Sequence, residues 1–364
     1  MATRRQVMTR LGGPILVALL AVSSAACNSV APSQTPSNSG ASQTTSSASF
    51  AATQSAGSVA TPTATLAPST LPIPTIPSIA GLPAGKVVAW GDDSQGQTDV
   101  PAALTGVVAV SGGDQFSLAL KSDGTVVGWG DDESGQIDVP AGLKNVVAIS
   151  GGGQFSLALK SDGTVVGWGD STDGQATPPS GLSKVVAISA AGQHSLALKS
   201  DGTVVAWGGN ANGESDVPVG LKNVVAISAG LDFSLALKSN GTVVAWGDKF
   251  PTDVPTGVVK VPAGLSGVKA IYAGYAHNLA LKSDGTVHGW GADGDGQVDV
   301  PDVASNVVAV AAGGNFSLAL KSDGTIVAWG ASGQDQTTVP AAAVGVAAID
   351  AGATHALAIV RQGT

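Results

Sequence analysis

Positive charge and cysteine are both scarce in this sequence. Lysine and arginine together number 17, against 26 aspartate and glutamate residues. A strongly acidic chain repels the phosphates of nucleic acids, so we expect no nucleic-acid partner. The single cysteine, Cys27, excludes an internal disulfide framework. Residues 86–364 also lack the 3.6-residue apolar periodicity of helices, which directs the interpretation toward strands and turns.

The first 26 residues have the features of an export signal. Arg4, Arg5 and Arg10 form a basic start, residues 15–22 form a short apolar run, and residues 23–26 are small. Cys27 follows at once, as in bacterial lipoproteins, although an apolar residue is usual where Ser24 stands. We therefore predict a signal peptide at 1–26 and a membrane-anchoring lipid on Cys27. The protein would then be exported and held on the outer side of the cytoplasmic membrane or at the cell surface. The other interpretation is an ordinary secretory signal, with Cys27 incidental.

Residues 27–85 have a different composition. Serine, threonine, alanine, proline and glutamine dominate, and residues 28–85 contain no charged residue and one aromatic residue, Phe50. Such a segment cannot bury enough apolar surface to offset the entropy lost on ordering. We predict a disordered linker, which as a flexible coil would span about 40 Å.

A unit of 39 residues recurs through the rest of the chain. Residues 117–130 read SLALKSDGTVVGWG, two short apolar runs joined by a turn whose Asp-Gly pair suits a hairpin. The tryptophans from Trp90 to Trp246 are 39 residues apart, Trp290 follows after 44 and Trp329 after 39 more. A fixed period of this size indicates a repeated supersecondary unit.

Each repeat contains four segments typical of strands, VVAIS, SLAL, VVAWG and QxDVP, separated by turn residues. Seven such units predict an all-β fold over residues 86–364, a seven-bladed β-propeller with four-stranded blades. The chain enters this part at VVAWG and leaves it at HALAIV, which are the two halves of one hairpin. We therefore expect strands within 87–101 and 344–360 to share one blade. That closure would remove the exposed sheet edges, and we expect a monomer.

The repeat VVAWG…GQ…DVP.GL..VVAIS.G..FSLALKSDGT resembles that of the RCC1 family, named for the regulator of chromosome condensation, over roughly residues 86–360. The resemblance implies a propeller and a habit of binding proteins, but no particular partner. The compact repeat is similar to that of bacterial members, which include a secreted propeller that inhibits β-lactamase. WD40 propellers fit less well, because Trp-Gly stands where Trp-Asp would end their blades.

Catalytic and metal-binding constellations are absent from the sequence pattern. His194, His277 and His355 share one repeat position, which phenylalanine fills in most other repeats, so packing is the favoured role. The segment DGDG at 293–296 resembles part of a calcium loop but lacks the remaining ligands. We expect no enzymatic activity, no cofactor and no bound metal.

Two loops of the repeat vary, one after Trp-Gly and one before SLAL, whereas KSDGT and VPxGL hardly change. In an antiparallel blade the two variable loops share one face, and this face is acidic. We predict that it binds a protein with a basic surface, through Asp92, Asp93, Asp131, Asp132, Glu133, Asp170, Asp173, Asp232, Tyr275, Asp293 and Asp295. The alternative is sequence drift at solvated turns.

The function that this pattern favours is a non-enzymatic protein-binding module displayed at the surface. Two alternatives remain, a secreted inhibitor of an enzyme, similar to the β-lactamase inhibitor, and a structural protein of the envelope. An enzyme acting through the variable face is disfavoured, because no catalytic set of side chains can be assembled.

Overall fold

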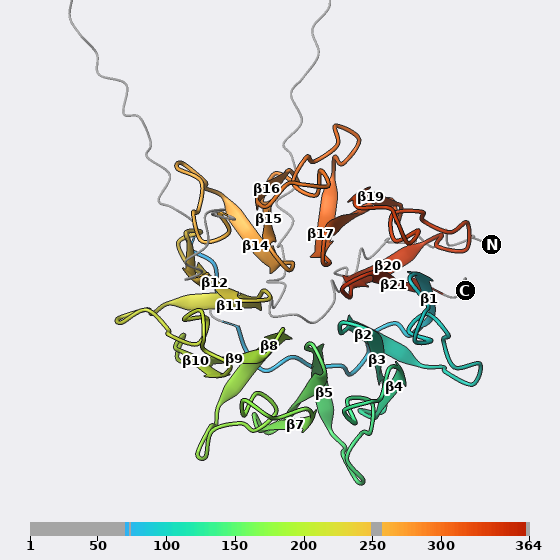
Figure 1. The fold of residues 1–364 in the computed structure, drawn as a ribbon, viewed down its shortest axis with the longest axis horizontal. Coiled ribbons are helices and arrows are strands. Elements are labelled where there is room, and N and C mark those ends of the chain that lie inside the picture. Colours follow the sequence, from blue (N-terminus) through green and yellow to red (C-terminus); the bar gives the residue numbers. More distant parts are fainter. Residues whose placement is uncertain (1–69, 73, 249–256, 362–364) are drawn as a thin grey trace, which may run out of the picture. The chain divides into compact units, whose positions relative to one another are not determined.

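The computed structural model describes residues 70–72, 74–248 and 257–361, which form an all-β propeller (Figure 1). The predicted signal, Cys27 and the linker up to residue 69 lie outside the described residues. The strands form five three-stranded sheets and one six-stranded sheet, ordered β20-β21-β1-β2-β3-β4. The six-stranded sheet divides into two three-stranded units, because β1 and β2 share only the pair Gly85↔Val107. Together with the five separate sheets, these two units make seven blades around the centre.

Each blade has an inner, a middle and an outer strand, with the inner strands facing the centre (Figure 1). The inner strands are β2 Val107–Gly112, β5 Val146–Gly151, β8 Val185–Ala191, β11 Val224–Ala229, β14 Val268–Ala273, β17 Val307–Ala312 and β20 Val346–Ala351. The middle strands are β3 Phe116–Lys121, β6 Phe155–Lys160, β9 His194–Lys199, β12 Phe233–Lys238, β15 His277–Lys282, β18 Phe316–Lys321 and β21 His355–Arg361. The outer strands are β4 Val126–Gly130, β7 Val165–Gly169, β10 Val204–Gly208, β13 Val243–Gly247, β16 Val287–Gly291, β19 Ile326–Gly330 and β1 Gly85–Gly91.

The middle strands are apolar on both sides because each blade packs between two others. Leu118 and Ala119 are neighbours in β3 and point to opposite faces of the sheet, yet both are fully buried. Leu118 packs with Ile149 of the following blade, whereas Ala119 packs with Leu357 of the preceding one. Trp129 also lies in the cluster with Leu357, so the tryptophan is an interblade wedge, as predicted.

The prediction of a fourth strand in each blade is wrong for the blades as far as residues 70–72, 74–248 and 257–361 describe them. The QxDVP segments form successive turns instead, as shown by the bonds from Gly135 N to Asp132 O and from Asp138 N to Gly135 O. The glutamine side chain is the physical reason. Gln136 is fully buried and its amide bonds within the loop, which holds the backbone in turns, and Gly135 has a φ of 73°.

The predicted ring closure is confirmed. Strand β1 pairs with β21 in antiparallel register from Gly85↔Arg361 to Gly91↔His355. The first strand of the chain is therefore the outer strand of the last blade. This arrangement pairs an edge of β21 that would otherwise be open.

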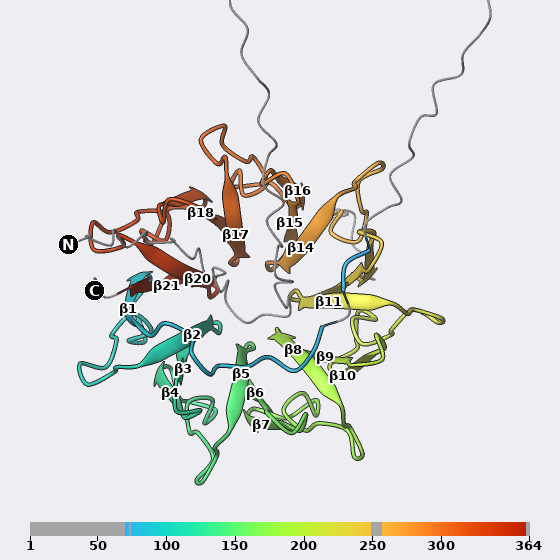
Figure 2. The ribbon, with the colours of Figure 1, turned by 180° about the vertical axis from the view of Figure 1, so that it is seen from behind.

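Residues 70–72 and 74–84 form an extended strap, although the sequence analysis assigned them to the linker. The strap crosses one end of the blades between β11 and β2 (Figure 2). Leu71, Ile76, Ile79 and Leu82 pack against four successive interblade clusters, and Leu71 N bonds to Ser239 O at 2.6 Å. Residues before 86 thus pack onto the propeller, because these spaced apolar side chains meet the ends of the interblade clusters. Within the described ranges, no helix long and apolar enough to cross a bilayer is present.

Candidate functional site

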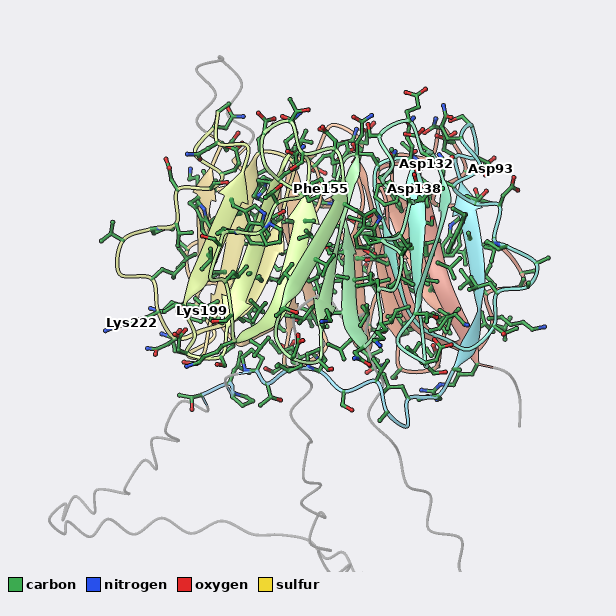
Figure 3. The ribbon with its side chains drawn as sticks, turned by 90° about the horizontal axis from the view of Figure 1, so that it is seen from below. Asp93, Asp132, Asp138, Phe155, Lys199 and Lys222 are labelled. Carbon is green, nitrogen blue, oxygen red and sulfur yellow. The ribbon has the colours of Figure 1, made fainter. Side chains whose placement is uncertain are left out.

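The antiparallel register sorts the loops onto two faces of the propeller. Lys121 at the end of β3 pairs with Val107 at the start of β2, so the KSDGT turns lie at one end of the blades. Figure 3 shows Lys199 and Lys222 on one face and Asp93 and Asp132 on the other. We call the first the lysine face; its turns are at 121–125, 160–164, 199–203, 238–242, 282–286 and 321–325. We call the second the acidic face; its loops include those at 92–97, 113–115, 131–136, 170–175, 230–232 and 293–297. The strap lies on the lysine face, since Ser239 belongs to one of its turns.

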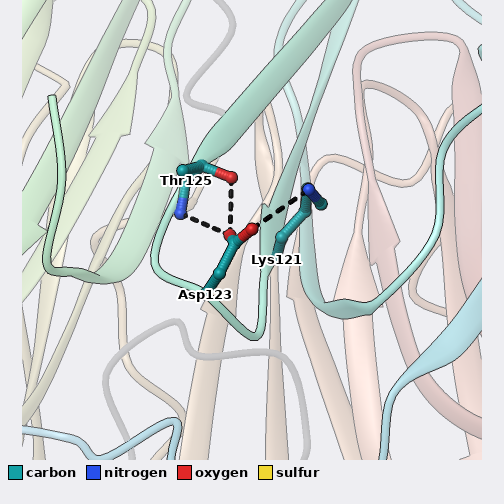
Figure 4. A network of polar contacts seen from close by, with 3 residues as sticks. All are labelled: Lys121, Asp123 and Thr125. Carbon is teal, nitrogen blue, oxygen red and sulfur yellow. Dashed lines mark hydrogen bonds and ion pairs between the residues drawn. The ribbon is translucent and has the colours of Figure 1, made fainter. Parts of the chain in front are cut away.

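On the lysine face each turn uses its own charges. The Asp123 carboxylate accepts hydrogen bonds from the Thr125 backbone N–H at 3.0 Å and hydroxyl at 2.6 Å, and Lys121 Nζ lies 3.2 Å away (Figure 4). These bonds, the Thr125 hydroxyl first, lower the pKa of Asp123 to about 2. The same geometry recurs at Asp162, Asp201, Asp284 and Asp323, with Asn240 in the remaining turn. The KSDGT sequence therefore repeats because it closes a hairpin.

On the acidic face the first aspartate of three loops is bound to a buried glutamine. Asp131 Oδ2 accepts from Gln136 Nε2 at 2.7 Å, and Gln136 Oε1 accepts from Ser134 N at 2.9 Å. The pairs Asp92–Gln97 and Asp170–Gln175 repeat this arrangement at 2.9 and 2.8 Å. These carboxylates organise their own loops and also bring negative charge to the face. Asp131 is only 7% exposed, so it offers charge rather than a broad contact surface.

A hollow of about 620 Å³ lies on the acidic face, over the centre of the ring. Carboxylates from five loops reach it, together with amide side chains and one tyrosine. No lysine or arginine is among its lining residues. The side chains that matter here are Asp92, Asp114, Asp131, Asp170 and Asp232, Tyr275, and the amides of Gln115, Gln154 and Gln193.

Asp114 and Tyr275 meet at this hollow although they come from blades on opposite sides of the ring. Asp114 follows β2, Tyr275 follows β14, and both side chains line the hollow, where the Tyr275 hydroxyl and the Asp114 carboxylate influence each other's pKa. Burial raises the pKa of Asp114, and desolvation followed by the charge of Asp114 raises the pKa of Tyr275. Burial likewise raises the pKa of Asp232. Sequence reasoning left Asp114 out of the site, although it lies in one of the two variable loops.

The predicted residues divide into two groups. Asp92, Asp131, Asp170, Asp232 and Tyr275 line the hollow. The others stand exposed on the surrounding loops: Asp93, Asp132, Glu133, Asp173, Asp293 and Asp295. Three of this second group also hold their loops, since Asp93 accepts from Thr98 N, Asp132 from Ile137 N and Asp293 from Val298 N. Among the residues that the structure describes, no cluster of three His, Cys, Asp or Glu side chains could hold a metal ion.

Comparison with known proteins identifies the repeat. Six segments match the regulator of chromosome condensation (RCC1) repeat, at residues 107–136, 146–175, 185–214, 224–248, 268–297 and 307–336. Each begins at an inner strand and five of them end at the loop glutamine or its glutamate equivalent. The chain belongs to the RCC1-repeat β-propeller family. No curated protein sequence matches it significantly.

Solved RCC1-type structures share the fold. Prp20p of Saccharomyces cerevisiae superposes with a TM-score of 0.65 at 19% identity, covering 78% of this chain and 93% of Prp20p. The ectodomain of the receptor kinase CR4 from Physcomitrella patens is 27% identical, with a TM-score of 0.54, covering 67% of this chain and 68% of the ectodomain. Human WBSCR16 is 16% identical, with a TM-score of 0.60, covering 77% of this chain and all (100%) of WBSCR16.

Three of the four histidines, His194, His277 and His355, are buried between blades, whereas His288 is exposed. His194 Nε2 lies 2.9 Å from Ser234 Oγ of the next blade, and His277 and His355 make the equivalent contacts with Ser317 and Ser117. Because each serine hydroxyl already donates to a backbone carbonyl, the histidine Nε2–H is the donor. Burial lowers the pKa of all three histidines to about 4. The predicted packing role is confirmed, with a hydrogen bond between blades that phenylalanine cannot make.

Proposed function

We propose that this RCC1-repeat propeller is a non-enzymatic binding module that presents its acidic face to a protein with a basic surface. The observation that carries the proposal is the hollow, where five aspartates converge without a lysine or arginine among the lining residues. Such a field attracts cationic partners and speeds their encounter, and salt weakens it.

The contrast in internal pairing supports this choice of face. On the lysine face the turn aspartates are paired within 3.1–3.6 Å of lysines in the same turn. The carboxylates of the hollow are instead held by amides and hydroxyls, which orient them without neutralising them. Their charge is therefore available to a ligand.

The strap supports the same choice. The polypeptide joins the propeller on the lysine face, where Leu71 bonds to Ser239 and the strap covers the ends of several blades. Any attachment through the N-terminal segment reaches the propeller at that face. The acidic face is then the free one, in keeping with an exported monomer that a lipid on Cys27 anchors to a membrane.

The relatives supply the wider class of function. Prp20p has binding properties toward Gsp1p and histones, and it has been solved with Kap60. We carry over from them only the use of the RCC1 propeller as a surface for other proteins. The basic character of the proposed partner follows from the chemistry of the hollow.

The test uses two triple variants that change the net charge equally. The hollow variant removes three carboxylates, through Asp92→Ala, Asp131→Ala and Asp170→Ala. Alanine is the natural residue at this repeat position in two other blades, as Ala292 and Ala331. The lysine-face variant removes three carboxylates, through Asp123→Asn, Asp162→Asn and Asp201→Asn. Asparagine is the natural residue at this position in one turn, as Asn240. The probes are cytochrome c, as a basic protein, and its lysine-acetylated form.

We expect the full-length wild type to bind cytochrome c at low salt and to ignore the acetylated form. At about 0.5 kcal/mol for each ion pair with the ligand, the hollow variant should bind roughly tenfold more weakly, whereas the lysine-face variant should match the wild type. Equal losses in both variants would indicate a net-charge effect with no preferred face. A loss confined to the lysine-face variant would show that the wrong face was chosen.

A further inference from the structure

Serine hydroxyls link the inner strands of successive blades around the central channel. Ser111 Oγ accepts from Gly151 N at 3.1 Å, and Ser150 Oγ accepts from Ala190 N at 3.0 Å. Ser189 and Ser228 accept from the following blades in the same way, each at 3.0 Å. This inner-strand position therefore ties each blade to the next one along the chain, and Tyr272 and Ala311 occupy it in two other blades.

The last blade carries a carboxyl group at this position. Asp350 Oδ2 accepts from Gly112 N of the first complete blade at 2.9 Å. This is the seam of the ring, where strands separated by 238 residues in sequence meet. A charge-bearing acceptor thus replaces a neutral hydroxyl at the one interblade joint where the two ends of the propeller come together.

The surroundings of Asp350 contain no compensating cation. It is 5% exposed and lines a channel cavity of about 80 Å³, whose other titratable groups are Tyr272, Asp114 and Tyr275. On the elements packed against β20, the middle strand β21 carries His355 and Arg361, and β18 carries Lys321. His355 is buried and bonded to Ser117, while Arg361 and Lys321 stand at the strand ends on the lysine face. Burial raises the pKa of Asp350 to about 7 against 3.8 for a free aspartate, and the backbone and Ser111 hydrogen bonds only partly oppose that shift.

We propose that Asp350 makes closure of the propeller ring proton-dependent, with the seam firm when this carboxyl is protonated and weakened when it ionises. An ionised carboxylate at this position, only 5% exposed, is largely desolvated, and no lysine or arginine lines the cavity beside it. The folded protein therefore holds the proton more tightly than the unfolded chain does. By linkage, the stabilising contribution is complete below about pH 4 and is lost as the pH rises toward and through about 7.

The test compares full-length wild type with Asp350→Ser, which restores the hydroxyl of the other repeats, and with Asp350→Asn. Denaturant unfolding is measured across the pH range between the free and the buried aspartate values. Relative to both variants, the unfolding equilibrium constant of the wild type should rise by up to tenfold per pH unit. Asp114→Asn removes the other carboxyl of the channel. This variant should keep the dependence of the unfolding equilibrium constant on pH that comes from Asp350.

Hydrogen exchange gives a local readout that global unfolding does not. Above about pH 7 the Gly112 amide of the wild type should exchange faster than the same amide in Asp350→Asn, whereas the Ala190 amide, bonded to Ser150, should not differ between the two proteins. Identical pH slopes in wild type and Asp350→Ser, or a slope that vanishes only in Asp114→Asn, would overturn the proposal. So would equal exchange of Gly112 in both proteins at every pH.

Discussion

The two faces of the propeller are built on the same strands but handle charge in opposite ways. On the lysine face Asp123 and its repeats are satisfied within their own turns by a threonine and a lysine. On the acidic face Asp131 and its equivalents are oriented by glutamines, and Asp114 and Asp232 are partly desolvated. The comparison shows that a loop can repeat unchanged when its polar groups close on themselves. A loop whose charge points outward is free to differ from blade to blade.

The largest expected loss of stability comes from deleting the strap that covers part of the lysine face. Deleting residues 70–84 removes Leu71, Ile76, Ile79 and Leu82 from four interblade clusters. At about 1 kcal/mol for each half-buried side chain, the free energy of unfolding should fall by roughly 3–5 kcal/mol. Denaturant unfolding of the truncated and full-length proteins measures this. A deletion at 28–42 is the matched control of equal length and should leave the unfolding midpoint unchanged.

Substituting Gln136 removes the hydrogen bonds that hold one loop of the acidic face. Gln136→Ala removes the partner of the Ser134 N–H and leaves the buried Asp131 carboxylate with only the Glu133 N–H, which should cost about 1–3 kcal/mol of folding free energy. Gln154→Ala is the control, because Gln154 is exposed at the hollow, and it should change stability by less than about 0.5 kcal/mol. Equal effects of the two substitutions would mean that the glutamine does not support the loop.

Breaking an ion pair of the lysine face should have a smaller effect. Lys160 lies 3.1 Å from Asp162, and both side chains reach solvent, with 27% and 56% exposure. Lys160→Ala should therefore lower the free energy of unfolding by less than about 1 kcal/mol. A thermal or denaturant midpoint that falls as far as in Gln136→Ala would contradict this ranking.

As the pH falls, the carboxyl groups of the two faces should change the free energy of unfolding in opposite directions. The pKa of Asp123, Asp162 and Asp284 is lowered to about 2, so their contribution to stability is present above about pH 4 and is lost as the pH falls toward 2. The raised pKa of Asp114 and Asp232 has the reverse sign, because protonation stabilises the folded state. Replacing the three turn aspartates by asparagine should flatten only the acid limb of the stability curve. Asp114→Asn should leave that limb in place, and an unchanged limb in the triple variant would refute the assignment.

Much of the fold could be predicted because the repeat compares equivalent positions within one chain. The spacing from Trp90 to Trp329 indicated the blades, and the split hairpin at the chain ends indicated the pairing of β1 with β21. The exchange of histidine and phenylalanine before SLAL indicated a buried packing position. The two faces followed from antiparallel connectivity, which places alternate loops at opposite ends of a blade.

Other features depend on which side chains become buried, and against what, when the blades assemble. Whether QxDVP formed a strand depended on the burial of Gln136, which turns the backbone away from the sheet edge. The strap lacks strand or helix periodicity, and only the shape of the assembled ring offers its apolar side chains a surface.

The repeat itself determined the blades, their order and the chemistry of each face, because these depend on local strand and turn preferences and on a period of 39 residues. Only the tertiary structure decided which residues from distant blades the aspartates meet. Tyr275 and Asp114, from blades on opposite sides of the ring, meet at the hollow, and Asp350 bonds to Gly112 across 238 residues of sequence. Both contacts exist because the curvature of seven packed blades closes the ring, a property of the whole assembly that no single repeat contains.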